Sequence, residues 1–244
     1  MLLAEPPIGL LAGASLFLDF DGTLVELAER PDAVSIGVGL GPLLQRLMVA
    51  LDGRVALVSG RSVAQLDELL PGAVRMTVAG SHGAEIRNIG GTIAGPDRPA
   101  ALAEASALFT ERFTDRHGVV IEDKTLGVAI HYRLDPAVRN EVHALAEQFA
   151  QAHVLEIQTG KMLVELRVPG HDKGSAIATL LDRPPFAGHR PLFLGDDVTD
   201  ETGFVIAAAR KGAGILIGPA RETAARYRLP DVSAVHAWLG AAAA

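Results

Sequence analysis

Four short apolar stretches of this chain each end in polar or acidic residues, and this repeated pattern constrains the fold more than any other feature. The stretches are LFLDFDGT (16–23), VALVSGR (55–61), MTVAGSH (76–82) and PLFLGDDVTDE (191–201). Continuous apolar runs of this length are typical of strands that are buried on both faces of a parallel sheet. Ligands of such sheets bind beyond the carboxyl ends of the strands. The pattern therefore predicts a parallel sheet with a polar site along one edge.

Helical segments separate these predicted strands. The leucines of GPLLQRLMVAL (41–51) recur at helical spacing, and Ser62 is placed to cap a helix over 62–70 that Pro71 and Gly72 would end. The alternation of strand and helix favours an α/β fold of the Rossmann-like, parallel type. We expect its strands at 16–20, 54–58, 76–79, 191–195 and 214–218, and further helices at 172–182, 199–210 and the C-terminus.

The middle of the chain follows a different pattern. GVVIEDKTLGVAIHYRL (118–134) and HVLEIQTGKMLVELRV (153–168) each indicate a hairpin of alternating strands with a polar turn. Predicted helices at 99–115 and 136–150 precede the two hairpins. A repeated helix-hairpin unit predicts a small antiparallel sheet backed by two helices, which is an α+β domain inserted into the parallel one. We therefore expect a core domain at 1–95 and 169–244, an inserted cap domain at 96–168, and linkers at 88–99 and 168–171.

Composition excludes several classes of function. The net charge is -7, without a visible basic stripe, which argues against a nucleic-acid partner. Because the chain has no Cys, disulfides, thiolate metal sites and cysteine nucleophiles are excluded. The apolar segment 6–18 lacks a basic leader and is shorter than the roughly 18 residues of a membrane span. We expect a cytoplasmic protein that does not bind a membrane; the oligomeric state stays open, and a monomer is compatible with the sequence.

Acidic residues at the predicted sheet edge suggest a metal site. If the fold brings Asp19, Asp21 and Asp196 together, their repulsion requires a proton or a cation for relief. Oxygen ligands with an open coordination shell suit Mg²⁺ beside a substrate phosphate. A carboxylate facing a phosphate can act as a nucleophile, and a second one two residues on can transfer protons. Ser59 and Lys173 would then hold the phosphoryl oxygens.

Each of these signals also has an ordinary structural explanation. An Asp-x-Asp pair after a strand is often a turn or a helix cap, Ser59 can cap a helix, and Lys173 can be a solvated helix residue. The conjunction changes this balance, because DFDGT, SGR, DKG and GDDVTDE follow one another in that order.

With these four motifs the chain resembles the haloacid dehalogenase superfamily of phosphohydrolases. The resemblance implies that Asp19 is the phosphorylated nucleophile and that Asp21 is the general acid and then the general base. It also implies that Mg²⁺ binds the Asp19 carboxylate, the Asp21 main-chain carbonyl and Asp196. Asp200 and Asp197 would support the metal site. The implied phosphate and substrate ligands in the core are Ser59, Gly60, Arg61, Lys173, Gly22 and His82.

Further stretches resemble one branch of this superfamily, the trehalose-6-phosphate phosphatases. They are LFLDFDGTL, ERPDAV, AGSHGAE, HYR, GKMLVELR and GDDVTDE. This resemblance implies a Mg²⁺-dependent hydrolysis of trehalose 6-phosphate to trehalose and phosphate. On a strand, Lys161 and Glu165 share a face opposite the apolar residues. That charged face could meet water or a sugar. The resemblance favours the sugar, with Arg133 as a further candidate.

Two alternatives remain at this stage. The same chemistry could act on another sugar phosphate, such as sucrose phosphate, a mannosyl or glucosyl phosphoglycerate, or a hexose phosphate. The chain could also be a phosphosugar-binding module without turnover. The combination of Asp19, Asp21, Ser59, Lys173 and Asp196 favours an enzyme, because a sensor needs no nucleophile beside an acid.

Overall fold

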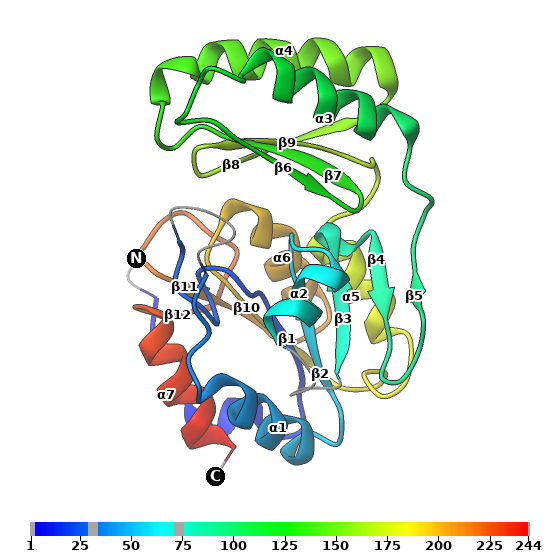
Figure 1. Ribbon diagram of the computed structural model, residues 1–244. Helices are drawn as coiled ribbons and strands as arrows, with labels where there is room; N and C mark the ends of the chain where they lie inside the picture. Colours follow the sequence, from blue (N-terminus) through cyan, green and yellow to red (C-terminus); the bar gives the residue numbers. More distant parts are fainter. Residues whose placement is uncertain (1–2, 29–33, 71–75, 244) are drawn as a thin grey trace. The chain divides into compact units, whose positions relative to one another are not determined.

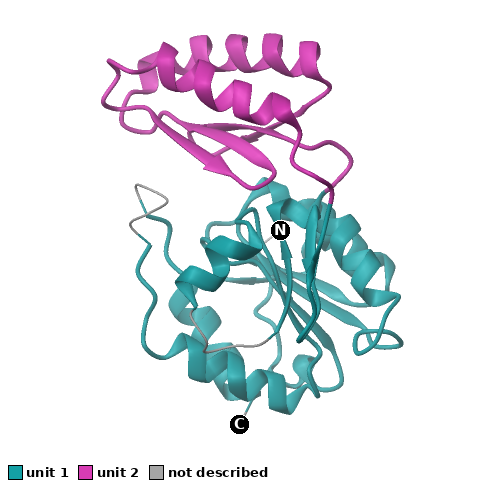
Figure 2. Cartoon of the chain, turned by 45° about the vertical axis from the view of Figure 1, so that its right-hand side comes forward, with its two compact units in different colours: residues 1–95, 172–244 teal, residues 96–171 magenta. Residues whose placement is uncertain are grey.

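The computed structural model describes residues 3–28, 34–70 and 76–243. The chain divides into two compact units (Figure 2). The larger unit comprises residues 1–95 and 172–244, and the smaller unit comprises residues 96–171. The sequence placed the end of the inserted domain at residue 168, whereas the smaller unit ends at 171.

The larger unit is built on an eight-stranded sheet, counted over the described residues, with the order β12-β11-β10-β1-β2-β3-β4-β5 (Figure 1). Its strands are β1 (Ser15–Leu18), β2 (Val55–Val58), β3 (Thr77–Gly80), β4 (Glu85–Arg87), β5 (Ile93–Ala94), β10 (Pro191–Gly195), β11 (Ala213–Ile217) and β12 (Tyr227–Leu229). The neighbours from β12 to β3 pair in parallel, and β4 and β5 add antiparallel pairs at one edge. The predicted parallel sheet is confirmed.

Helices cover both faces of this sheet because successive strand residues point to opposite faces. Leu16 and Leu18 join one core with α1 and α7, whereas Phe17 joins another core with α5 and α6. The helices of the larger unit are α1 (Leu40–Ala50), α2 (Val63–Leu69), α5 (Lys173–Leu181), α6 (Glu201–Ala209) and α7 (Val232–Ala242), with short 3₁₀ turns at Ile8–Leu11, Ser81–Gly83 and Val198–Asp200. Burial of near-continuous apolar strands on both faces explains why they show no alternation in the sequence.

The smaller unit is a four-stranded antiparallel sheet in the order β6-β7-β9-β8, backed by two helices (Figure 1). Its elements are α3 (Ala100–Arg112), β6 (Val120–Lys124), β7 (Gly127–His131), a 3₁₀ turn at Pro136–Val138, α4 (Arg139–His153), β8 (Glu156–Gly160) and β9 (Leu163–Arg167). Val128, Ile130, Val164 and Leu166 pack with Leu102, Phe109 and Val142 of the helices. The predicted helix-hairpin repeat and its apolar face are confirmed.

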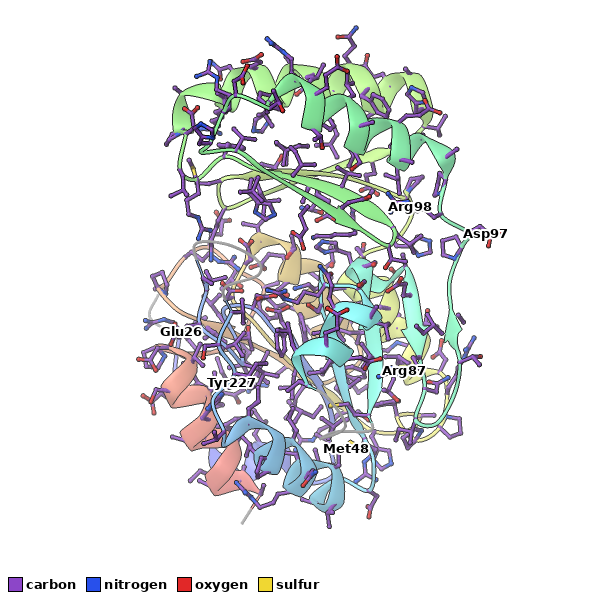
Figure 3. All side chains as sticks on the ribbon, viewed as in Figure 1. Glu26, Met48, Arg87, Asp97, Arg98 and Tyr227 are labelled. Atoms are coloured by element: carbon purple, nitrogen blue, oxygen red, sulfur yellow. The ribbon has the colours of Figure 1, made fainter. Side chains whose placement is uncertain are left out.

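Two arginines, both labelled in Figure 3, attach peripheral segments to their units. Arg87 on β4 forms a bidentate ion pair with Asp67 of α2. Arg98, near the start of the smaller unit, donates to the Asp123 carboxylate and to the carbonyls of Lys124 and Thr125. The second contact fixes the β6–β7 turn to the chain that enters this unit.

Some details differ from the sequence prediction. Strands β4, β5 and β12 are not predicted, and β5 lies inside the predicted linker 88–99. Each has only two or three residues, which is too short for a periodic pattern. Pro71 and Gly72, proposed to end α2, lie outside the described residues, as does most of the ERPDAV stretch. Among the described residues, no helix combines the length and apolar character that a membrane crossing requires.

Candidate active site

The predicted site residues of the larger unit follow the carboxyl ends of neighbouring strands. Asp19 follows β1, Ser59 follows β2 and Asp196 follows β10. The hydrogen bonds between strands continue into Asp19 and Ser59, because the Asp19 N–H donates to the Leu194 carbonyl at 3.0 Å and the Ser59 N–H donates to the Ala79 carbonyl at 2.9 Å. The parallel register therefore brings segments distant in the sequence to one edge of the sheet.

Lys173 joins two buried carboxylates at this edge. Its Nζ donates to Asp19 Oδ1 and to Asp200 Oδ1, each at 2.7 Å. Lys173 begins α5, and Asp172 caps that helix by accepting the Ser175 N–H at 2.6 Å. The capped helix start thus aims the lysine at Asp19, whose other oxygen accepts from the Thr23 hydroxyl at 3.2 Å.

Three carboxylates form a cluster that could hold a metal ion. Ligand oxygens of Asp19, Asp196 and Asp200 all lie within 4.8 Å of one another. Gly22, with φ +81°, leaves room for this cluster, since a Cβ there would lie 2.3 Å from Asp196 Oδ2. Oxygen-only ligands in a partly open cluster are the donor set that Mg²⁺ prefers. The donor set therefore fits a hard divalent cation.

The electrostatics of the cluster follow from its burial. Burial raises the pKa of the Asp19 carboxyl well above its usual value, and the charges of Asp200 and Asp196 raise it further, while Lys173 opposes the rise. Burial acts to lower the pKa of Lys173, but the charges of Asp19 and Asp200 outweigh it and raise that pKa above its usual value. Lys173 is therefore held as a cation beside a carboxylate that is costly to ionise.

Asp21 is directed to a different partner. Its carboxylate accepts two hydrogen bonds from Arg61, from Nε at 2.6 Å and from Nη2 at 2.8 Å. The Arg61 N–H in turn donates to Ser59 Oγ at 3.1 Å. This bidentate pair fixes the plane of the Asp21 carboxylate, which is 28% exposed, next to the predicted phosphate-binding segment. The sequence indicated Arg61 only as a possible substrate ligand.

The segment after β3 supports the loop 59–61. The His82 N–H donates to the Ser59 carbonyl at 2.9 Å, and a Cβ on Gly60 would lie 2.7 Å from the His82 ring atoms Cε1 and Nε2. Ser81, His82 and Gly83 all have positive φ, at 48°, 55° and 97°. For the first two residues this left-handed conformation is strained, by about 1–3 kcal/mol each. The strained turn places the imidazole of His82 against Gly60.

The acidic loop after β10 is held by its own side chains. Asp200 Oδ2 accepts the Asp197 N–H at 2.9 Å, and Asp197 Oδ1 accepts the Val198 N–H at 2.7 Å. Gly195 is required here because a Cβ would lie 2.3 Å from Asp200 Cγ. Asp200 thus serves both this turn and Lys173, whereas the side chain of Asp197 caps the turn.

In the smaller unit, Glu165 forms an ion pair with Lys124, a residue that the sequence motifs do not point to. Lys124 Nζ donates to Glu165 Oε2 at 2.7 Å, and their side chains are 10% and 4% exposed. Lys161 lies in the β8–β9 turn, because β9 begins at Leu163, so the prediction that places it on the strand is wrong. Its carbonyl accepts from Arg133 Nη2 at 3.3 Å. Glu122 and Lys124 are two residues apart on β6 and therefore lie on the same face of the sheet. This spacing of charged residues is the sequence signal that could have identified Lys124.

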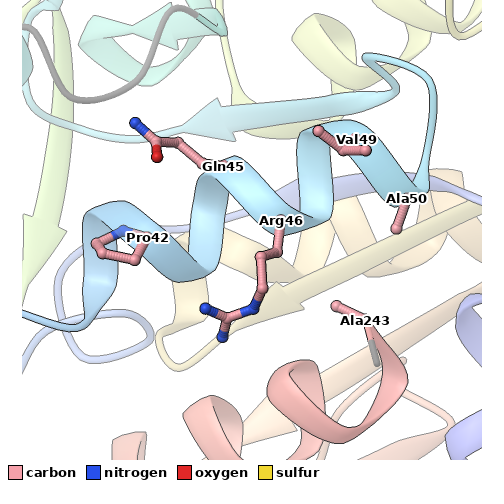
Figure 4. A pocket seen from close by; sticks show the side chains of 6 residues that line it. All are labelled: Pro42, Gln45, Arg46, Val49, Ala50 and Ala243. Carbon is pink, nitrogen blue, oxygen red and sulfur yellow. The ribbon is translucent and has the colours of Figure 1, made fainter.

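A separate groove of the larger unit contains none of the predicted site residues (Figure 4). It is lined by Pro42, Gln45, Arg46, Val49, Ala50 and Ala243. Since α1 leads into β2, its C-terminal end lies at the amino ends of the strands. The carboxylates and the lysine lie at the carboxyl ends.

A doubly wound parallel sheet with an inserted α+β unit, and with a buried lysine among carboxylates at its carboxyl edge, defines a phosphatase of the haloacid dehalogenase type. The solved structure of a haloacid dehalogenase-like hydrolase from B. subtilis has the same fold, with a TM-score of 0.64 and 13% identity over 93% of this chain and 99% of that one. The chain belongs to the trehalose-phosphatase family, whose family model matches residues 17–233.

Individual relatives agree with this assignment. A trehalose-6-phosphate phosphatase of Escherichia coli is 38% identical over 97% of this chain and 89% of its own length. A probable trehalose-phosphate phosphatase of Sinorhizobium fredii is 42% identical over 84% and 78%, respectively. The crystal structure of a trehalose-6-phosphate phosphatase related protein covers 92% of this chain and 95% of its own, with 29% identity and a TM-score of 0.77.

Proposed function

We propose that this chain hydrolyses trehalose 6-phosphate to trehalose and inorganic phosphate through a phosphorylated Asp19. The observation that carries the proposal is the buried contact of Lys173 with Asp19 and Asp200, in a chain of the trehalose-phosphatase family. The names of the relatives from E. coli and S. fredii supply the substrate.

We assign Mg²⁺ to the acidic cluster. Asp19, Asp196 and the main-chain carbonyl of Asp21 would hold it, with Asp200 in support, and the bound ion would offset the charge of the phosphoryl oxygens. The mutual proximity of the three carboxylates supports this assignment. In the absence of a cation, their repulsion would have to be relieved by protonation.

The residues of the chain then carry the reaction in two steps. An Asp19 oxygen attacks phosphorus, the bond from phosphorus to the sugar oxygen breaks, and Asp21 donates its proton to that oxygen. In the second step Asp21 takes a proton from water, whose oxygen attacks phosphorus and releases phosphate from Asp19. Lys173 and the Ser59 hydroxyl hold the phosphoryl oxygens in both steps. Arg61 orients the Asp21 carboxylate through its two hydrogen bonds. At least one of these two hydrogen bonds breaks when Asp21 takes up a proton.

We assign recognition of the sugar to the polar face of the β6-β7-β9-β8 sheet. The Lys124 and Glu165 pair supplies a cation and an anion suited to hydroxyl groups, and both side chains are nearly buried. Arg133 and Lys161 are further candidates. Polar groups that depend on substrate hydroxyls reject analogues, since a poor fit leaves those groups unpaired. We also propose that the protein is located in the cytoplasm.

A panel of sugar phosphates tests the substrate. Phosphate release is measured with trehalose 6-phosphate, sucrose 6-phosphate, a glucosyl phosphoglycerate and glucose 6-phosphate, each with Mg²⁺ and with EDTA. We expect the highest kcat/KM for trehalose 6-phosphate, and activity only with the metal. A higher kcat/KM for another member would replace the substrate. Tight binding without turnover of any member would replace the enzyme by a phosphosugar-binding module.

A further inference from the structure

A side chain from a distant segment fastens the acidic loop that follows β10. Arg221 lies after β11, and its Nη2 donates to the Asp197 carbonyl at 2.7 Å. Its Nη1 donates to the Glu201 carboxylate and to the Glu222 carbonyl, the latter at 3.1 Å. One guanidinium therefore contacts both ends of the turn between Asp197 and Glu201.

The carbonyl that Arg221 contacts also closes the turn. The Asp197 carbonyl accepts the Asp200 N–H at 3.1 Å, and the Asp197 N–H donates to Asp200 Oδ2 at 2.9 Å. Asp197 is thus bonded through both main-chain groups to Asp200, the carboxylate that contacts Lys173. A displacement of the Asp197 main chain would move Asp200 and the neighbouring Asp196 together.

Glu201 makes a second contact with the segment that contains Arg221. Its Oε2 accepts the Ala224 N–H at 2.8 Å, while its other oxygen accepts from Arg221. The side chains of Arg221 and Glu201 are 27% and 25% exposed, so that water screens their attraction only in part. Glu201 therefore links the start of α6 to the segment 221–224, and Arg221 links the same segment to Asp197.

We propose that Arg221 is a positioning residue that sets the metal affinity of the acidic cluster by holding the 196–200 loop in place. This inference rests on the proposed function, because it assigns the divalent cation to Asp19 and Asp196. Groups that hold the ligands of a metal typically change its affinity by about 10- to 100-fold when they are removed. The guanidinium fork suits two acceptors at once, which the single ammonium group of lysine does not replace.

The test is metal binding without substrate. Thermal unfolding of the wild type and of Arg221→Met is followed in EDTA and over a Mg²⁺ titration, and the rise of Tm with Mg²⁺ is fitted to a stabilisation of RT ln(1 + [Mg²⁺]/Kd) to give the apparent Kd. We expect this Kd to rise about 10-fold in Arg221→Met and by less in Arg221→Lys. At saturating Mg²⁺, kcat and the KM for trehalose 6-phosphate should return to near wild type.

Arg210→Met is the matched control, because this substitution also removes one ion pair, the one between Arg210 and Asp182. Arg210 lies at the other end of α6. It should titrate like the wild type. An Arg221→Met variant that titrates like the wild type would overturn the inference while leaving the phosphatase proposal intact. A wild type without any Mg²⁺-dependent shift would contradict the metal site itself and the inference with it. If Arg221→Met unfolds in EDTA, Arg221→Lys and Glu201→Gln carry the same comparison.

Discussion

Lys173 Nζ lies 2.7 Å from Asp19 Oδ1, and each of these side chains is only 4% exposed. The lysine at the start of α5 and the aspartate after β1 are separated by 153 intervening residues, since their positions differ by 154. Only the doubly wound topology brings them together. A buried ion pair of this kind contributes little net stability, because desolvation offsets the attraction. Its position at the carboxyl edge indicates a catalytic use.

Replacing Lys173 tests this interpretation. In Lys173→Met two buried carboxylates lose their cation, so the free energy of unfolding in EDTA should fall by about 3–5 kcal/mol. Because a phosphoryl ligand is lost as well, kcat should fall by about 100- to 1,000-fold. Urea unfolding and phosphate release measure the two effects. Lys211→Met, at an exposed position, is the control, and a Lys173→Met rate close to that of the control would contradict the assigned role.

Gly22 offers a test of the acidic cluster. In Gly22→Ala the new Cβ would lie 2.3 Å from Asp196 Oδ2, so Asp196 must move. We expect a higher Mg²⁺ concentration for half-maximal activity, by about 10-fold or more. Gly188→Ala separates this effect from backbone strain, because Gly188 has the same φ of +81° and a Cβ there would meet nothing within 4 Å. Equal Mg²⁺ requirements in the two variants would rule out the contact as the cause.

The raised pKa of Asp19 predicts how pH affects stability without metal. A carboxyl group whose pKa is higher in the folded than in the unfolded chain binds more protons when folded. The contribution of Asp19 to the free energy of unfolding therefore falls as pH rises from the ordinary pKa of 3.8 to the raised value. A cation favours the ionised carboxylate, so the stabilisation by Mg²⁺ should grow over the same window. The measurement is Tm against pH in EDTA and in Mg²⁺.

Asp19→Asn is the comparison for this pH dependence, because the amide does not titrate. The growth of the Mg²⁺ effect with pH should be smaller in this variant than in the wild type. If the two proteins show the same growth, Asp19 does not carry the effect.

The buried pair of the smaller unit separates sugar recognition from chemistry. Glu165→Gln should raise the KM for trehalose 6-phosphate by about 10-fold or more, since a charged hydrogen-bond partner is lost. It should leave kcat/KM for p-nitrophenyl phosphate unchanged, because that substrate has no sugar. Glu156→Gln is the matched control, as Glu156 is 42% exposed and pairs with Arg167 on the same sheet. Equal losses on both substrates would argue that Glu165 only stabilises its unit.

The sequence was sufficient for the features that depend on long apolar runs and on strand ends. The strand residues before Asp19, Ser59 and Asp196 are buried whatever their neighbours, so their pattern alone predicts the sheet and its polar edge. The helix-hairpin repeat was predictable for the same reason, because period-two alternation needs no knowledge of partners.

Contacts between side chains were not predictable from these local patterns. The pairing of Arg61 with Asp21 depends on the β1–β2 register, and that of Lys124 with Glu165 depends on how β9 lies beside β7. Lys161 was misplaced because β9 begins later than the alternation suggests: the β8–β9 turn consists of Lys161 and Met162, the latter with φ +63°. The attachment of Arg221 to Asp197 involves an irregular segment, for which no periodic signal exists.

The proposed mechanism requires that the Asp19 carboxylate receives the phosphoryl group. The most direct measurement is steady-state phosphate release from trehalose 6-phosphate by Asp19→Asn, with the intact mass of the variant checked against deamidation. We expect a kcat about 1,000-fold or more below that of the wild type, and a cooperative thermal unfolding transition that shows the variant to be folded. Phosphate release by Asp19→Asn at the wild-type rate would contradict this mechanism.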